Sequence, residues 1–195
     1  MTIRFVLAST SPRRSELLRT LGIPFETISP LFKEVPTDHS VSDEALYFAE
    51  AKARSVAKLY PKALILGSDT LIELEGEKIG KPENDDMARE ILKKLSGKTH
   101  RLYTAVVLLN TNDDSIRRHV EEVLITFREI SLQEIEAYVA TGEPIGKAGA
   151  YAIQGGGKKF AIDIKGDLQA VVGLPLRVIQ QWLKEFMGHD TNEKR

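Results

Sequence analysis

The chain has 195 residues, of which 42% are hydrophobic and 28% charged, close to the averages of soluble globular proteins. At about 150 residues per domain, this length predicts one domain with room for two lobes, and the composition argues against wholesale disorder. The net charge of −1 disfavours a globally basic nucleic-acid binder, and the lack of cysteine excludes disulfide, zinc-thiolate, iron–sulfur and cysteine-nucleophile chemistry.

No apolar run reaches the roughly 18 residues that cross a membrane, and the apolar stretch at the N-terminus is too short for the core of a signal peptide. The sequence therefore predicts a cytoplasmic protein that does not bind a membrane. No long basic cluster interleaved with aromatic residues occurs, so a nucleic-acid polymer is not an expected partner.

Up to residue 97 the chain alternates predicted strands with capped helices. Ser11 and Pro12 are typical of a helix start, as N-cap and first helical residue. In chain order we expect a strand over 4–8, a helix from Ser11 to Gly22, a strand over 25–28, a loop over 29–41, a helix from its cap Ser42 to about Leu59, a buried strand over 63–67, a hairpin of 70–74 with 77–79, and a helix from its cap Asn84 to Leu95.

The second half of the chain continues this mixture of elements. We expect two long strands on either side of 110–114, a helix opened by the capping box of Ser131 and Glu134, a half-buried strand around 160–164, and a helix over about 176–187 that Gly188 ends. Residues 189–195 indicate a frayed tail. Because strands and helices are intermixed, the fold class is α/β or α+β with a mixed sheet.

Residues 7–18, LASTSPRRSELL, lead from a strand through a Ser/Thr-rich turn into a helix. A helix start offers free backbone N–H groups and the positive end of the helix dipole. Arg13 and Arg14 add two guanidinium groups, and Ser9 and Ser11 add hydroxyls, which together suit a phosphate. The alternative interpretation is an ordinary helix cap with solvated arginines.

Two further segments each contain a charged residue that is a candidate for the site. Asp69 follows an apolar strand, where a carboxylate can orient water, accept its proton or hold a divalent metal; alternatively it makes a turn with Ser68. Lys81 lies between Gly80 and Pro82, which restricts its backbone. It is either a phosphate contact or an ordinary surface lysine.

Residues 142–160 are rich in small residues, which allow the backbone to approach a ligand closely. Lys147 and Gln154 are the main polar side chains there, and a glutamine amide can complement the edge of a nucleobase. The alternative is a flexible surface loop. Because no GxxxxGK[ST] string occurs, a P-loop enzyme is disfavoured. The four histidines show no metal-ligand spacing, and we expect each, His100 included, to be structural.

Taken in order, these segments resemble the Maf family of nucleoside triphosphate pyrophosphatases. The matching strings are LASTSPRRSELL, GSDT, GKP, LSGKTH, GEP, KAGAYAIQG and VVGLPL, which span residues 7–176. The resemblance implies a Maf/ITPase-like α/β fold over 1–188, with a mixed elongated sheet flanked by helices and two lobes with a cleft between them. It also implies hydrolysis of a nucleoside triphosphate to the monophosphate and pyrophosphate, a divalent cation (Mg²⁺ or Mn²⁺), and a cytoplasmic homodimer.

The family's functional residues map onto individual positions of this sequence. The resemblance implies that Asp69 is the proton acceptor and that Arg13, Thr70 and Gln154 set specificity. Asp69 is expected to activate water either directly or through a bound divalent cation, which Glu34 helps to hold. Further cleft positions are Lys52, Lys81, Ser9 and Ser11. On the sequence alone, the helix that carries Lys52 is more typical of a solvated surface.

Arg13, Thr70 and Gln154 together resemble the subgroup that acts on dTTP and UTP. One departure from the family pattern is Leu168, where an aromatic residue is frequent. Two alternatives stay open: a pyrophosphatase for 7-methyl-GTP or another modified nucleotide, and a non-catalytic regulator of cell division that acts by protein contacts.

Overall fold

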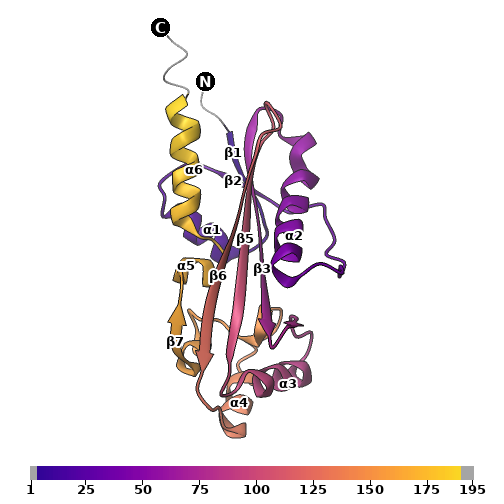
Figure 1. The fold of residues 1–195 in the computed structure, drawn as a ribbon, viewed down its shortest axis with the longest axis vertical. Helices are drawn as coiled ribbons and strands as arrows, with labels where there is room; N and C mark the ends of the chain where they lie inside the picture. The colour runs from indigo at the N-terminus through magenta and orange to yellow at the C-terminus, as the bar shows by residue number, and fades with distance from the viewer. Residues whose placement is uncertain (1–3, 190–195) are drawn as a thin grey trace.

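A computed structural model describes residues 4–189, which form a seven-stranded mixed sheet flanked by helices (Figure 1). The strands are β1 (Arg4–Ala8), β2 (Glu26–Ile28), β3 (Ala63–Leu74), β4 (Glu77–Ile79), β5 (Thr99–Asn110), β6 (Ile116–Phe127) and β7 (Ala161–Lys165). Their spatial order is β2-β1-β3-β5-β6-β7, with β4 paired to β3. Only β1 pairs in parallel, with β2 and β3; the other described pairs are antiparallel.

The sheet is elongated because β3, β5 and β6 each extend over 12 residues. At about 3.3 Å per residue, each of these strands is roughly 40 Å long, long enough to contribute to two separate cores. The helices are α1 (Pro12–Arg19), α2 (Val41–Val56), α3 (Asp85–Leu95), α4 (Leu132–Val139), α5 (Leu168–Val172) and α6 (Leu176–His189).

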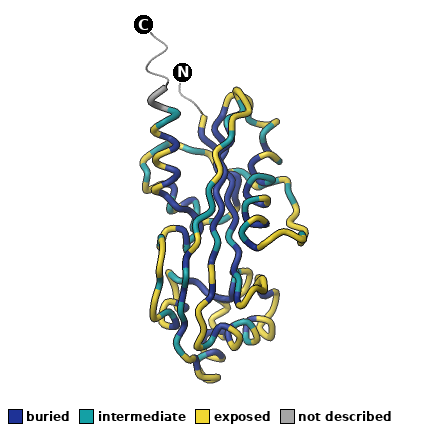
Figure 2. Tube along the Cα trace, in the orientation of Figure 1, coloured by how far each residue is buried: buried dark blue, intermediate teal, exposed yellow. Residues whose placement is uncertain are grey.

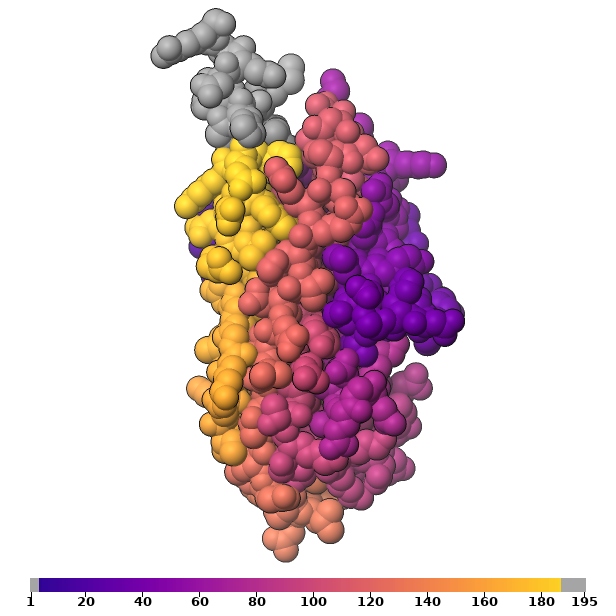
Figure 3. All heavy atoms as spheres, viewed as in Figure 1, coloured from indigo at the N-terminus to yellow at the C-terminus, as the bar shows by residue number. Residues whose placement is uncertain are grey.

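Helices cover both faces of the sheet in the upper lobe, the half that contains β1 and β2. Side chains of a strand alternate between its faces, and β3 shows this: Ile65 packs with the apolar residues of α2, and Leu66 packs with those of α1 and α6. Figure 3 shows α2 and α6 on opposite sides of β6. The lower lobe packs α3 and α4 against the other half of the same strands. Buried residues therefore follow β3 and β5 through both lobes (Figure 2).

The structure confirms the mixed sheet, the capped helices after Ser11 and Asn84, and the capping box of Ser131 with Glu134. The predicted cap Ser42 is wrong. Ser40 is the N-cap, because its Oγ accepts a hydrogen bond from the Asp43 N–H at 3.2 Å. The helix proper ends at Val56, and residues 57–59 form a 3₁₀ turn.

Three other predicted boundaries are also wrong. The strand over 63–67 and the first arm of the hairpin are one continuous strand, β3. Phe160 belongs to a 3₁₀ turn instead of the following strand, and Ile162 within that strand is exposed. Helix α6 continues through His189; the rest of the predicted tail, 190–195, lies outside the described residues. Among residues 4–189, the helices are each too short or too polar to span a bilayer.

His100 lies in the core of the lower lobe and is only 1% exposed. Its Nε2 is 2.9 Å from the Tyr151 hydroxyl, and its ring packs edge-on against Phe127 at a centroid distance of 4.9 Å. Burial lowers the pKa of His100 to about 4 because the charged imidazolium is poorly solvated there. It is thus a hydrogen-bonded structural histidine, as expected.

This burial predicts a pH-dependent stability. The unfolded chain takes up a proton at His100 near pH 6.5 and the folded chain only near pH 4, so protonation between these values favours unfolding. The free energy of unfolding should therefore fall by about 2 kcal/mol between roughly pH 7 and 5 through this group. Urea titrations at several pH values measure how steeply the free energy of unfolding changes with pH. His100→Gln should reduce this slope, and the exposed control His39→Gln should not. Equal slopes in all three proteins would contradict a buried, neutral His100.

Candidate functional site

A cavity of about 700 Å³ opens at the edge of the sheet between the two lobes. Strand β1 ends at Ala8, which pairs with Gly67 of β3, whereas β4 pairs with β3 only from Ile72 onward. Within the described residues, positions 68–71 of β3 therefore have no strand partner on this edge. The gap gives a ligand access to side chains in the middle of a buried strand.

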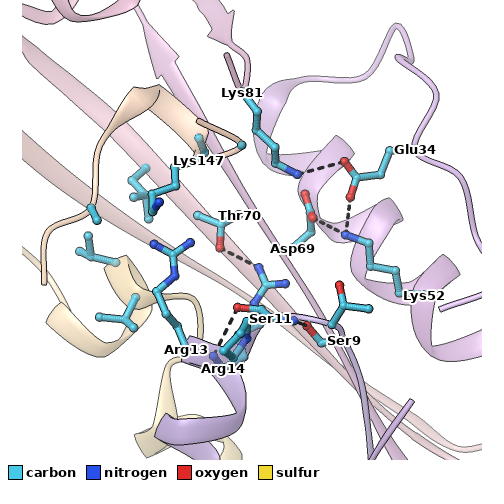
Figure 4. A pocket seen from close by; sticks show the side chains of 18 of the residues that line it. Ser9, Ser11, Arg13, Arg14, Glu34, Lys52, Asp69, Thr70, Lys81 and Lys147 are labelled. Atoms are coloured by element: carbon cyan, nitrogen blue, oxygen red, sulfur yellow. Dashed lines mark hydrogen bonds and ion pairs between the residues drawn. The ribbon is translucent and has the colours of Figure 1, made fainter. Parts of the chain in front are cut away.

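Asp69 occupies this gap and faces α2 (Figure 4). Its Oδ1 lies 2.5 Å from the Lys52 Nζ, which also lies 2.6 Å from the Glu34 Oε1. The Lys81 Nζ is 3.2 Å from the other oxygen of Glu34. Asp69 is 1% exposed and Lys52 8%, so these two charges form a buried ion pair, whereas Glu34 and Lys81 reach the solvent-facing side of the cavity.

The carboxylates of Glu34 and Asp69 differ in how many of their oxygens already have a hydrogen-bond partner. Burial alone raises the pKa of the Glu34 carboxyl, but the hydrogen bonds and charges of Lys52 and Lys81 outweigh it and hold that pKa below its ordinary value. Both oxygens of Glu34 are engaged by ammonium groups. The Asp69 Oδ2, in contrast, is buried and has no hydrogen-bond partner among the described residues. A ligand, water or cation in the cavity can satisfy this oxygen.

Gly67 allows α2 to approach β3 closely enough for the buried ion pair to form. A Cβ built at Gly67 would lie 2.1 Å from the backbone oxygen of Ala49 in α2. Lys52 follows Ala49 by about one helical turn, and Asp69 follows Gly67 on the same face of the strand. The glycine therefore places the lysine directly against the carboxylate.

Thr70 points to the opposite face of the sheet, toward the start of α1. Its Oγ1 accepts a hydrogen bond from the Arg14 Nη2 at 3.1 Å and lies 2.9 Å from the Thr104 hydroxyl. The Arg14 Nε donates to the carbonyl of Gly173 at 3.1 Å. Burial lowers the pKa of Arg14, although the nearby charge of Asp69 opposes this shift. Arg14 is thus a cation held in a fixed orientation at the cavity wall.

The turn before α1 also lies at the cavity. The Ser11 Oγ accepts from the Arg14 N–H at 3.4 Å and caps the helix, and the Ser9 Oγ accepts from the Ser11 N–H at 3.1 Å. Arg13 extends from the first turn of α1 toward Lys147 across the cavity (Figure 4). Burial lowers the pKa of Lys147, and the positive charge of Arg13 lowers it further.

Two backbone hydrogen bonds join the loop of Lys81 to the loop of Lys147. The Gly146 N–H donates to the carbonyl of Pro82 at 3.0 Å, and the Gly149 N–H donates to the carbonyl of Gly80 at 3.2 Å. Because these bonds lie on either side of both lysines, the two ammonium groups belong to one connected wall of the cavity.

The lower lobe gives the cavity an apolar part. Gln154 lies on this side and is exposed. The apolar lining residues of this lobe are Leu102, Ile145, Ala148, Tyr151, Ala152, Ile153, Val171 and Val172. A flat, partly polar group such as a nucleobase fits this combination of apolar surface and one amide.

All nine residues predicted from the sequence line this one cavity: Ser9, Ser11, Arg13, Glu34, Lys52, Asp69, Thr70, Lys81 and Gln154. Lys52 faces the cavity and not bulk solvent. Arg14 and Lys147 also line the cavity: the sequence indicated Arg14 as a phosphate contact beside Arg13 and Lys147 as a polar residue of a small-residue segment, but the family resemblance mapped no role onto either. The signal for Arg14 was its place beside Arg13, and for Lys147 its place in a glycine-rich segment.

The described lining holds five basic side chains and two acidic ones, an excess of three positive charges. The basic residues are Arg13, Arg14, Lys52, Lys81 and Lys147. Such an excess, together with the N–H groups at the start of α1, favours binding of a polyanion such as a polyphosphate.

The sequence and the fold were compared with those of known proteins. A family model described as Maf-like protein matches residues 4–186. A dTTP/UTP pyrophosphatase of Bacillus cereus (strain AH820) is 42% identical over 184 residues, which cover 94% of this chain and 95% of that protein. A dTTP/UTP pyrophosphatase of Syntrophus aciditrophicus (strain SB) is 40% identical over 187 residues, 95% of this chain and 91% of that protein. Among solved structures, the Ham1 protein of Staphylococcus aureus aligns with a TM-score of 0.45 and 16% identity, over 64% of this chain and 71% of that one.

The geometry predicts unequal roles for Lys52 and Lys81 in stability. Removing Lys52 leaves the Asp69 carboxylate buried without its partner, which typically costs about 3–5 kcal/mol. Removing Lys81 breaks only an exposed pair, which is typically worth less than about 1 kcal/mol. Urea unfolding of Lys52→Met, Lys81→Met and the double variant Lys52→Met/Asp69→Asn measures the difference. We expect the double variant to regain stability over Lys52→Met; a similar small loss in both single variants would contradict a buried ion pair.

Proposed function

The chain belongs to the Maf family, and from that premise we propose that it is a nucleoside triphosphate pyrophosphatase that hydrolyses dTTP and UTP to the monophosphate and pyrophosphate. The observation that carries this proposal is Asp69, a buried carboxylate with one free oxygen in a cavity lined by five basic side chains. The two relatives are named dTTP/UTP pyrophosphatases, which supports dTTP and UTP over 7-methyl-GTP as substrates. Location in the cytoplasm and assembly as a homodimer are proposed from the family resemblance.

The first task of such a site is to hold about four negative charges. Repulsion by these charges otherwise disfavours attack of water at the α-phosphorus. Arg14 and the N–H groups at the start of α1 approach a triphosphate from one side of the sheet, whereas Lys81 and Lys147 approach it from the lower lobe. The cations are held by hydrogen bonds before substrate arrives, so little reorganisation is needed in the transition state.

The second task is to remove a proton from the attacking water. Lys52 occupies the Asp69 Oδ1 and thereby fixes the plane of the carboxylate, which leaves Oδ2 as the acceptor. A water hydrogen-bonded to Oδ2 transfers its proton there as it attacks phosphorus, and pyrophosphate leaves.

The family resemblance also implies a divalent cation, Mg²⁺ or Mn²⁺. Among the described residues, no cluster of three or more acidic, histidine or cysteine side chains is present to hold one. The free Oδ2 of Asp69 and the nearby Glu34 nevertheless fit Mg²⁺, which usually binds one or two carboxylates together with substrate phosphates and water. We therefore propose Asp69 and Glu34 as its protein ligands: Glu34 would exchange one of its two ammonium contacts for the cation, and the Asp69 Oδ2 would activate water through the cation in place of accepting its proton directly. When bound, the cation supplies positive charge to the phosphate oxygens.

The proposed attack predicts both the product and the effect of Asp69→Asn. With dTTP or UTP and Mg²⁺, the protein should release pyrophosphate and not orthophosphate, and chelation of the metal should abolish turnover. Asp69→Asn keeps the size of the side chain but removes the base, so kcat should fall by at least roughly 100-fold. A coupled pyrophosphate assay measures both effects.

The matched control is Asp163→Asn, an exposed carboxylate of β7 that does not line the cavity. It should keep wild-type turnover. Orthophosphate as the first product, or near-normal turnover in folded Asp69→Asn, would contradict the proposed chemistry.

Gln154 generates a prediction about base choice. Uracil and thymine present a carbonyl acceptor beside an N–H donor, which match the donor and acceptor of a glutamine amide, whereas cytosine reverses both groups. A desolvated mismatch costs about 1–3 kcal/mol, so kcat/KM for dTTP and UTP should exceed that for CTP by roughly 5- to 150-fold.

Replacing the Gln154 amide tests this assignment. Gln154→Glu removes the amide donor and should narrow the preference for UTP over CTP, whereas Gln181→Glu, at an exposed position of α6, should leave that preference unchanged. Equal kcat/KM for CTP and UTP in the wild type would remove Gln154 from base recognition.

A further inference from the structure

Gln154 lies in a segment whose main chain is bound on both sides by one pair of side chains. The Tyr138 hydroxyl accepts a hydrogen bond from the Ala152 N–H at 3.1 Å, and the Glu143 Oε2 accepts one from the Gly156 N–H at 3.1 Å. The pair is itself joined, because the Tyr138 hydroxyl donates to the Glu143 Oε1 at 2.6 Å. These contacts fix the backbone two residues before and two residues after Gln154.

The three glycines that follow Gln154 make this arrangement sterically feasible. A Cβ at Gly155 would lie 2.5 Å from the Glu143 carboxylate, and one at Gly156 would lie 3.1 Å from the Tyr138 ring. A Cβ at Gly157 would lie 2.9 Å from the backbone oxygen of Ala152. The segment therefore wraps so closely around the pair that larger residues would displace it, which a freely moving surface loop would not require.

The protonation states suit these hydrogen bonds. Burial and the neighbouring Glu143 carboxylate raise the pKa of Tyr138, so its hydroxyl keeps the proton that it donates. Burial alone would raise the pKa of Glu143, but the hydrogen bonds from Tyr138 and from the Gly156 and Gly157 backbone outweigh it and lower that pKa. Glu143 is thus an ionised acceptor. Tyr138 is 1% exposed and does not line the cavity, so the pair acts on a ligand only through the segment it holds.

The same pair also reaches the cationic part of the site. The Lys147 Nζ donates a hydrogen bond to the backbone carbonyl of Glu143. In contrast, the described hydrogen bonds of Thr70 go to Arg14 and Thr104, so Thr70 does not hold Gln154 in place.

We propose that Tyr138 and Glu143 are positioning residues for base discrimination: they hold the main chain on both sides of Gln154 and thereby restrict the position from which its amide meets a pyrimidine edge. This inference rests on the proposed dTTP/UTP activity. A glutamine on a flexible segment can shift to reach the hydrogen-bonding groups of either uracil or cytosine, whereas one on a fixed segment reaches a base from few positions and adapts less well to the mismatched one. Discrimination, more than turnover, should therefore depend on the pair.

The test compares kcat/KM for UTP and CTP in Tyr138→Phe, Glu143→Gln and wild type. Tyr138→Phe removes the hydroxyl that donates to Glu143 and accepts from Ala152, and Glu143→Gln removes the charge and one acceptor oxygen; both changes keep the shape of the side chain. We expect the UTP/CTP ratio to narrow by about 3- to 10-fold, the range that corresponds to one net hydrogen bond, mainly through KM for UTP. The matched control is Tyr103→Phe, whose hydroxyl makes no hydrogen bond to the described residues and should leave the ratio unchanged.

Two further measurements keep the proposal falsifiable if Tyr138→Phe fails to fold. Gly155→Ala should push Glu143 out of its contacts and narrow the ratio in the same way. Hydrogen–deuterium exchange over residues 152–157 should accelerate in Glu143→Gln without a change at β3. An unchanged UTP/CTP ratio in folded variants overturns the proposal, even if stability falls. A wild type that lacks activity on dTTP and UTP instead overturns the proposed function on which it rests.

Discussion

The buried ion pair of Lys52 and Asp69 is the interaction on which the rest of the site depends. A carboxylate that is 1% exposed in the middle of a strand is stable only when a countercharge reaches it, and Lys52 supplies that charge at 2.5 Å. The countercharge reaches it because Gly67 lets α2 lie against β3. The same ion pair leaves one oxygen of Asp69 without a partner, and this oxygen is the proposed acceptor for the proton of the attacking water.

Because the sheet is long and its strands run through both lobes, the proposed substrate contacts both lobes. Strand β3 carries Asp69 and Thr70 at the point where β1 has ended and β4 has not begun, so the cavity reaches the centre of the sheet. The upper lobe contributes α1 and α2 with their basic side chains. The lower lobe contributes apolar surface, Gln154 and two lysine loops that hydrogen-bond each other. In the proposed complex, the triphosphate therefore lies among basic side chains and the base lies on the apolar surface of the same cavity.

Local signals were enough to predict much of this structure from the sequence. Helix caps such as Ser11, Asn84 and Ser131 act within one turn, so the sequence shows them directly. The continuity of β3 was missed because Ser68 and Asp69 are polar residues, typical of a strand end. Their polarity is satisfied by partners remote in sequence, Gly173 for Ser68 and Lys52 for Asp69. The site residues were found through the order of their motifs. Arg14 was not assigned because neighbouring helical residues point about 100° apart, which the sequence alone does not relate to a cavity.

The central claim is that water, activated by Asp69, attacks the α-phosphorus. Hydrolysis of dTTP in water enriched in ¹⁸O tests it directly, because mass spectrometry of the products shows which phosphorus received the new oxygen. The account predicts one ¹⁸O atom in the monophosphate and none in the pyrophosphate. Label in the pyrophosphate, with unlabelled monophosphate, would place the attack at the β-phosphorus and contradict it.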